Sequence, residues 1–276
     1  MVADLHSHST VSDGLLTPAE VALRAHKNGV TMWALTDHDE VGGLAEAEQT
    51  AQGLGMQFVP GVEISVTWLN QTVHIVGLNI NYNHLELIDA LRYVRSGRVQ
   101  RSEKMAQALA KLGIEGALEG AESFATNPEL VSRTHFARYL ITQGYCSTMQ
   151  EVFDKYLGDG KPAFVPMQWA RLENAIRWIH EAGGVAVIAH PGRYNFSPLQ
   201  FDLLFETFKD LGGEGIEVLT GSHTPDQYLQ YAQIAKRYDF DASCGSDFHG
   251  FTEGRIDLGG LPPLPSGLRP VWQRWV

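Results

Sequence analysis

The stretch Ala3-Asp4-Leu5-His6-Ser7-His8 opens the chain with a short apolar strand that ends in two imidazoles. Because side chains alternate along an extended strand, His6 and His8 point to the same face. Two neutral imidazoles on one face suit a divalent metal ion. The pair alone is a weak signal, so its weight depends on whether other strands end in the same way.

Strand and helix patterns alternate along most of the chain. The strands expected from apolar runs are 3–6, 31–36, 57–60, 72–78, 185–189, 215–219 and 241–244. Helical periodicity is expected at 18–28, 43–54, 169–182, 198–211 and 225–238. The sequence Thr17-Pro18-Ala19-Glu20 is a typical helix start, with Thr17 as the N-cap. Repeated alternation predicts an α/β fold with a mostly parallel sheet, either open or closed into a barrel.

The middle of the chain departs from this alternation. Residues 82–159 show only helical periodicity, with segments near 85–95, 99–112 and 132–143, and Ser132 is a suitable N-cap for the last. Between Arg92 and Arg138 there are 8 basic and 5 acidic residues, a local balance of +3. We therefore expect a helical insert, 82–159, on an α/β body formed by 1–81 and 160–276. Ordinary solvated helix faces would give the same charge count.

Further titratable groups fall at or near the predicted strands. These are Asp37 and His38 after 31–36, Glu63 just beyond 57–60, His74 inside 72–78, His190 after 185–189, and Asp247 and His249 after 241–244. Taken alone, His74 reads as an ordinary core histidine. Burying so many such groups without partners would be costly, and imidazoles and carboxylates are the ligands that divalent metals accept. If the strands converge, they supply ligands for two or three metal ions.

Composition limits the class of protein. The 276 residues are 44% hydrophobic, carry a formal net charge of −11 and include two cysteines. The acidity argues against coating nucleic acid or binding a DNA duplex, which requires a basic surface. Two distant cysteines, no signal-peptide pattern and no long apolar run predict a cytoplasmic protein without a membrane segment. No obligatory protein partner is evident.

Taken together, the sequence resembles the PHP (polymerase and histidinol phosphatase) family. The matching motifs, in the family's order, are His6-Ser7-His8, Thr36-Asp37-His38, Glu63, His74, Ala189-His190-Pro191 and Asp247-Phe248-His249. The resemblance spans nearly the whole chain. It implies a distorted (β/α)7 barrel with an inserted helical subdomain and a trinuclear metal centre at the carboxyl ends of the strands.

The resemblance also implies which residues bind each metal ion. One ion would take His6, His8, Glu63 and Asp247. A second would share Glu63 and add His74 and His190, and the third would take Asp13, His38 and His249. Several relatives have histidine where this chain has Asp13. Manganese is the first choice of metal, with zinc, iron or magnesium as alternatives.

Within the family, the chain is most similar to the bacterial enzymes that hydrolyse nucleoside 3′,5′-bisphosphates. That similarity implies removal of the 3′-phosphate, as in pAp to AMP, by a metal-activated hydroxide. It also implies trimming of short 5′-phosphorylated RNA from the 5′ end. The alternatives are a phosphatase for another small metabolite, such as histidinol phosphate, and a non-catalytic PHP module.

Residues outside the ligand set are expected to bind the substrate or to assist proton transfer. Cations suited to phosphate lie beside the family motifs, and the expected set is Arg133, His135, Arg138, Lys161 and Arg193. Arg133 and His135 follow the expected N-cap Ser132, and a helix N-terminus favours anions. Asp37 and His223 are the candidates for proton transfer, although Asp37 also fits the role of orienting a metal ligand.

Overall fold

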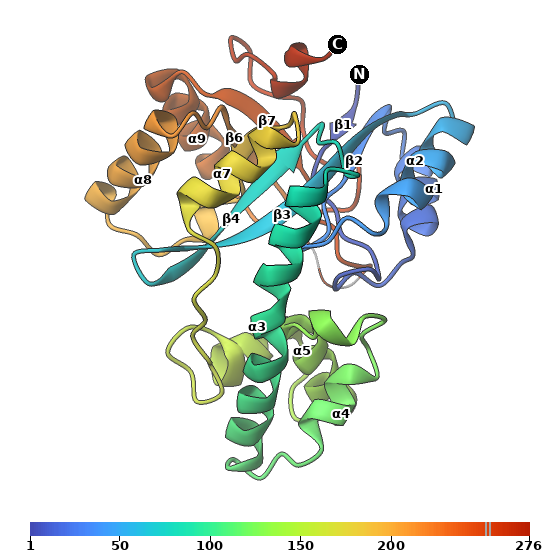
Figure 1. Ribbon diagram of the computed structural model, residues 1–276, viewed down its shortest axis with the longest axis vertical. Coiled ribbons are helices and arrows are strands. Elements are labelled where there is room, and N and C mark those ends of the chain that lie inside the picture. Colours follow the sequence, from blue (N-terminus) through green and yellow to red (C-terminus); the bar gives the residue numbers. More distant parts are fainter. Residues whose placement is uncertain (252, 254) are drawn as a thin grey trace.

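The computed structural model describes residues 1–251, 253 and 255–276 (Figure 1). These residues form one seven-stranded sheet in which the strands follow each other in chain order. The strands are β1 (Ala3–Asp4), β2 (Met32–Leu35), β3 (Gln57–Trp68), β4 (Gln71–Leu78), β5 (Val185–Ile188), β6 (Gly215–Thr220) and β7 (Asp241–Gly245). All seven predicted strands are therefore present.

The sheet curls round so that its first and last strands meet. The Leu5 N–H donates to Cys244 O at 2.9 Å and the Asp247 N–H donates to His6 O at 2.9 Å. Ser7 and Phe248 form a parallel bridge just beyond the strands. These contacts produce the predicted distorted (β/α)7 barrel. The sheet is mostly parallel, as expected, but β4 runs antiparallel to both β3 and β5.

The expected end of the third strand was wrong. The Pro60-Gly61 pair reads as a terminator, yet β3 continues to Trp68 because antiparallel pairing with β4 begins at Gly61, opposite Leu78. Gly61 fits this crowded position, since a Cβ there would lie 2.8 Å from Thr36 Cγ2. Glu63 consequently lies inside β3 rather than beyond a strand, which fixes its backbone on both sides.

Helices cover the outside of the barrel. They are α1 (Pro18–Lys27), α2 (Leu44–Gly53), α7 (Leu172–Glu181), α8 (Pro198–Asp210) and α9 (Pro225–Tyr238), with a short 3-10 turn at Pro191–Arg193 and another at Val271–Arg274. These five helices match the predicted ones to within a few residues. The Thr17 side chain and Glu20 form the expected capping box at the start of α1.

The helical insert projects from one side of the barrel, and a long helix connects the two (Figure 1). Its elements are α3 (Leu85–Ala110), α4 (Ala117–Glu122), a 3-10 turn at Pro128–Leu130, α5 (Arg133–Thr142), α6 (Met149–Val152) and a π turn at Phe153–Leu157. Ser132 caps α5 as expected. The two separate helices expected at 85–95 and 99–112 are one continuous helix, and α4 and α6 were missed.

The continuity of α3 has a packing explanation. Gly97 interrupts the apolar pattern, but it lies where a Cβ would come 2.3 Å from Met167 Cε, so glycine permits a close approach there. Leu87, Leu91 and Val94 pack in the barrel core. Met105 and Leu109 pack in the separate core of the insert. The change of core thus occurs within α3, and the division predicted at residue 82 stays a prediction.

Candidate metal centre and substrate cavity

The strands bring the predicted ligands to one place at the mouth of the barrel. His6 and His8 follow β1, His38 follows β2, and His190 follows β5, while Asp247 and His249 follow β7. Glu63 and His74 lie inside β3 and β4, on strands that pair directly. Sequence positions far apart are therefore neighbours, as expected for loops at the carboxyl ends of barrel strands.

The first ligand group is built around two histidines and two carboxylates. His6 Nε2 and His8 Nε2 are 3.1 Å apart, and each lies 3.2 Å from Glu63 Oε2. Asp247 Oδ1 is 3.2 Å from His8 Nε2 and 3.5 Å from His6 Nε2. One ligand atom from each of the four residues lies within 4.8 Å of the others.

Glu63 also joins a second group. Its Oε1 lies 2.8 Å from His74 Nδ1 and 2.8 Å from His190 Nε2. Its Oε2 lies 3.0 Å from His38 Nδ1, and Glu63, His38 and His74 form a compact set of three. His74 therefore faces the ligand cluster, as the resemblance implies, and its role as a metal ligand stays a prediction.

The third group surrounds Asp13, which lies in the loop after β1. Asp13 Oδ1 is 3.3 Å from His249 Nε2 and 3.8 Å from His38 Nε2. These three residues form a compact set together with His8. His38 thus turns one ring nitrogen toward Glu63 and the other toward Asp13, so the second and third groups share it.

The chemistry of this cluster fits divalent metal ions. The oxygens Asp13 Oδ1, Glu63 Oε2 and Asp247 Oδ1 are buried, and although imidazole nitrogens lie nearby, none of these contacts has the geometry of a hydrogen bond among the described residues. Buried carboxylate oxygens without partners are costly, and a cation removes that cost. Nitrogen and oxygen donors in this mixture suit zinc, manganese or iron.

The ionisation of the cluster is also consistent with metal ligation. Burial raises the pKa of the Glu63, Asp13 and Asp247 carboxyls, but the surrounding histidines hold each pKa well below its ordinary value. Burial lowers the pKa of His190 to about 3, with the Arg193 charge acting in the same direction. Ionised carboxylates and a neutral imidazole are the forms that bind metals. Burial also lowers the pKa of His6 and His8, but the neighbouring carboxylates outweigh it. They raise the pKa of His6 well above its ordinary value and that of His8 to about 10, so a bound metal ion would displace a proton from each of these rings.

A carboxylate that the sequence analysis missed orients two of these ligands. Glu217 lies inside β6, and its Oε1 accepts from His6 Nδ1 at 2.7 Å. Its Oε2 accepts from the His190 N–H at 2.6 Å. The ring contact fixes the tautomer and direction of the His6 imidazole, whereas the backbone contact holds the segment that carries His190. The available signal was an acidic residue in the otherwise apolar strand Gly215–Thr220.

The two residues expected to assist proton transfer are held by other groups. Asp37 Oδ1 accepts from the Ser9 N–H at 2.8 Å and from Ser12 Oγ at 2.5 Å, which ties down the loop leading to Asp13. His223 Nε2 accepts from the Gly192 N–H at 2.9 Å, and its Nδ1 donates to Val218 O at 3.2 Å. Their catalytic roles stay predictions, and these contacts favour positioning roles.

Comparison with known proteins agrees with this geometry. The PHP domain family matches residues 4–182, which is more than half of the chain. The chain belongs to the PHP family. Among curated relatives of this PHP protein, one from Chromobacterium violaceum is 48% identical over 270 residues and is named a 3′,5′-nucleoside bisphosphate phosphatase. That alignment covers 98% of this chain and 95% of the relative.

Other relatives of the PHP protein carry a different name. A protein from Escherichia coli is 43% identical over 277 residues, which is 100% of this chain and 94% of its own, and is named a 5′-3′ exoribonuclease. A solved structure from Chromobacterium violaceum, described as an amidohydrolase with bound sulfate and no metal, superposes with a TM-score of 0.96 at 47% identity. It covers 99% of this chain and 95% of the solved one.

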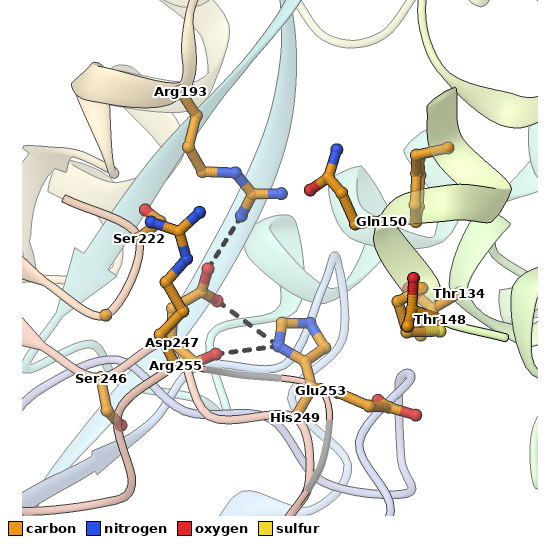
Figure 2. Close-up of a pocket in the computed structure, with 13 residues that line it drawn as sticks. Thr134, Thr148, Gln150, Arg193, Ser222, Ser246, Asp247, His249, Glu253 and Arg255 are labelled. Carbon is orange, nitrogen blue, oxygen red and sulfur yellow. Dashed lines mark hydrogen bonds and ion pairs between the residues drawn. The ribbon is translucent and has the colours of Figure 1, made fainter. Parts of the chain in front are cut away.

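A cavity of about 560 Å³ lies beside the ligand cluster of the PHP protein. Barrel loops line one side and the insert lines the other, with Thr134, Thr148 and Gln150 facing the barrel residues across the gap in Figure 2. Asp247 and His249 line both the cavity and the metal-ligand groups. A molecule in this cavity would therefore contact the candidate metal centre directly.

Two arginines of the barrel line this cavity. Arg193 Nη1 lies 2.8 Å from Asp247 Oδ2, so its guanidinium stands beside a candidate metal ligand (Figure 2). Arg255, which the sequence analysis missed, lines the same cavity. Because Arg255 belongs to a loop without a family motif, its sequence offered no signal.

Two further residues of the expected phosphate-binding set lie at the start of α5. Arg133 is about one-quarter exposed, and its Nη1 is 3.4 Å from Asp159 Oδ1. Burial lowers the pKa of Arg133; Asp159 opposes this, while Arg193 lowers it further. His135 Nδ1 accepts from the Ser132 N–H at 3.0 Å, and burial lowers its pKa to about 4, so the ring is neutral.

The remaining two residues of that set are placed differently. Arg138 is buried and pairs through Nε and Nη2 with both Glu253 oxygens at 2.7 and 2.6 Å, while Nη2 also donates to Asp13 O at 2.5 Å. Two of the three guanidinium nitrogens are therefore paired within the protein, and the third, Nη1, is buried and has no hydrogen-bond partner among the described residues. Lys161 lies on the exposed turn after the π turn. Of the five expected phosphate-binding residues, Arg193 lines the cavity, whereas Arg133, His135, Arg138 and Lys161 are not among its lining residues.

Proposed function

We propose that the chain is a metal-dependent phosphoesterase that removes the 3′-phosphate from nucleoside 3′,5′-bisphosphates. The observation that carries this proposal is the continuity between the ligand cluster and a cavity lined by two arginines, with Asp247 belonging to both. The names of the relatives support the same reaction class.

In this proposal, three divalent ions, with manganese as the first choice, are held by the predicted ligands. They are His6, His8, Asp13, His38, Glu63, His74, His190, Asp247 and His249. Bound there, such ions supply an activated water near neutral pH and offset charge on a phosphoryl group. Glu217 keeps the His6 ring directed at the cluster, and Asp37 holds the loop that carries Asp13.

The chain's own cations orient the substrate. Arg193 stands over Asp247 at the edge of the cluster, where it can hold the phosphate that is attacked. Arg133, on the insert side, does not itself line the cavity, but its guanidinium lies 5.6 Å from the ring of Phe153, which does, and we assign it to the second phosphate of a bisphosphate. A planar guanidinium offers two parallel hydrogen bonds to phosphate, so both positions favour arginine over lysine.

A second activity, removal of nucleotides from the 5′ end of short 5′-phosphorylated RNA, is supported by the relatives that are named 5′-3′ exoribonucleases. The walls of the cavity come from two separate parts of the chain, the barrel loops and the insert (Figure 2). The net charge of −11 still argues against binding long nucleic acids along the surface.

The proposed function is tested by phosphate release with and without metal. After chelation, activity on a nucleoside 3′,5′-bisphosphate should disappear, and stoichiometric Mn²⁺ should restore it. Under the same conditions we expect slower trimming of a 5′-phosphorylated trinucleotide and little release from histidinol phosphate. Full activity of a metal-free preparation, or a preference for histidinol phosphate, would contradict the proposal.

Replacing Arg133 by alanine tests its assignment to the second phosphate. We expect the KM for a bisphosphate to rise by about 10- to 100-fold, the value of a charge-assisted hydrogen bond. The KM for a nucleoside 3′-monophosphate should change by no more than about threefold, because this substrate lacks the second phosphate that Arg133 is proposed to bind. The exposed Arg171, on the surface beside Glu173, gives a matched Arg171→Ala control. Equal losses on both substrates would remove Arg133 from this role.

A further inference from the structure

Asp39 connects the two segments that carry the central ligands. It follows His38 directly, is fully buried and adopts a left-handed backbone conformation with φ of 51°. Its N–H donates to Glu63 O at 2.9 Å, and its Oδ1 accepts from the Ser65 N–H at 2.8 Å. Asp39 therefore ties the loop that carries His38 to the strand that carries Glu63.

Two arginines from α3 hold Asp39 in this position. Arg95 Nη1 donates to the Asp39 carbonyl oxygen at 2.6 Å. Arg98 Nη2 forms an ion pair with Asp39 Oδ2 and lies 3.3 Å from Ser65 Oγ. The Arg98 guanidinium also lies 4.7 Å from the centre of the Trp169 ring, in the segment that returns from the insert.

Neither arginine has a place in substrate binding as described above. Both are almost fully buried, at 6% and 5% exposed, and neither lines the cavity. The left-handed region is uncommon for non-glycine residues, and although aspartate visits it more readily than most, a fixed left-handed backbone is determined by its surroundings. Contacts to the Asp39 carbonyl, carboxylate and N–H provide that determination, and two of the three groups are held by α3.

We propose that Arg98, assisted by Arg95, is a positioning residue that sets the placement of His38 relative to Glu63 through Asp39. This inference rests on the proposed function, in which His38 and Glu63 bind metal. Because α3 also leads into the insert that forms the far wall of the cavity, one helix fixes both the ligand spacing and the substrate wall. The insert is thereby part of the metal site as well as of the substrate site.

The test is metal affinity in variants of α3. In Arg98→Met we expect Mn²⁺ to bind about 10- to 100-fold more weakly, as for other residues that orient ligands. The kcat at limiting Mn²⁺ should fall and should recover in excess Mn²⁺, with the KM for substrate nearly unchanged. Arg98→Lys, which keeps the charge but loses the planar fork, should be intermediate. Arg92 lies on the same helix, about 62% exposed and paired with Asp89, so Arg92→Met is the matched control.

The outcomes separate this inference from the proposed function. If the wild-type chain binds no stoichiometric Mn²⁺, the proposed function fails. If the wild type binds and folded Arg98→Met binds equally tightly, the positioning role is overturned. Should Arg98→Met not fold, the Asp39→Asn/Arg98→Met double variant, which buries no lone charge, and Arg98→Lys decide the question. Wild-type Mn²⁺ affinity in either of them overturns the inference, and weakened affinity supports it.

Discussion

Replacing Glu63 by glutamine is expected to abolish most metal binding and to lower phosphoesterase activity by about a thousandfold or more. The two Glu63 oxygens lie within 3.2 Å of ring nitrogens from five histidines, which are His6, His8, His38, His74 and His190. An amide keeps the shape but presents an N–H₂ group and no negative charge to a cation. Several kcal/mol of transition-state stabilisation are therefore lost, which corresponds to about three orders of magnitude in rate.

The measurement combines metal content after desalting with phosphate release from a bisphosphate. Bound manganese should fall from about three ions per chain to about one, because only the group around Asp13 lacks Glu63 as a ligand. Glu173→Gln, at a half-exposed surface position, is the matched control and should behave as the wild type. A folded Glu63→Gln protein that retains its metal and stays within tenfold of wild-type activity would exclude Glu63 as the shared ligand.

Most of the side chains that gather at the mouth of the barrel could be predicted because their signal is local. A polar residue at the end of an apolar strand is visible in one sequence, and closing the barrel brings such ends together. The strand carrying Glu63 was cut short because Pro60 and Gly61 look like a terminator. Its extension depends on antiparallel pairing with β4, which is a non-local contact that no window of sequence contains.

The partners of the cationic residues could not be predicted for a similar reason. Sequence analysis could place Arg133, Arg138 and Arg193 near family motifs, but it could not say which guanidinium already had a carboxylate partner. Arg138 is separated from Glu253 by 115 residues, and only the folded chain brings them together. The same is true of Arg98 and Asp39, whose pairing joins the insert to the barrel.

Replacing Arg138 by methionine is expected to lower the free energy of unfolding by about 3–5 kcal/mol, because Glu253 is left buried without its partner. The Arg138 and Glu253 side chains are only 6% and 8% exposed, and both carboxylate oxygens accept from the guanidinium. By contrast, Arg237 is mostly exposed where it pairs with Asp202, so Arg237→Met should cost less than about 1 kcal/mol. Denaturant unfolding of the metal-free proteins measures both.

The double variant Arg138→Met/Glu253→Gln separates this role from the phosphate-binding role that the sequence indicated. If the pair is structural, removing both charges should recover most of the stability lost in Arg138→Met, since no unpaired charge stays buried. Well below the unfolding transition and with saturating Mn²⁺, the KM for a bisphosphate should then change by no more than about threefold. A KM raised about a hundredfold in Arg138→Met, together with less than about 1 kcal/mol of destabilisation, would instead show that Arg138 binds the substrate phosphate. The two roles therefore predict opposite patterns, because the Nε and Nη2 groups of Arg138 already donate to Glu253 and to Asp13 O, and its remaining Nη1 group, although it has no partner among the described residues, is buried.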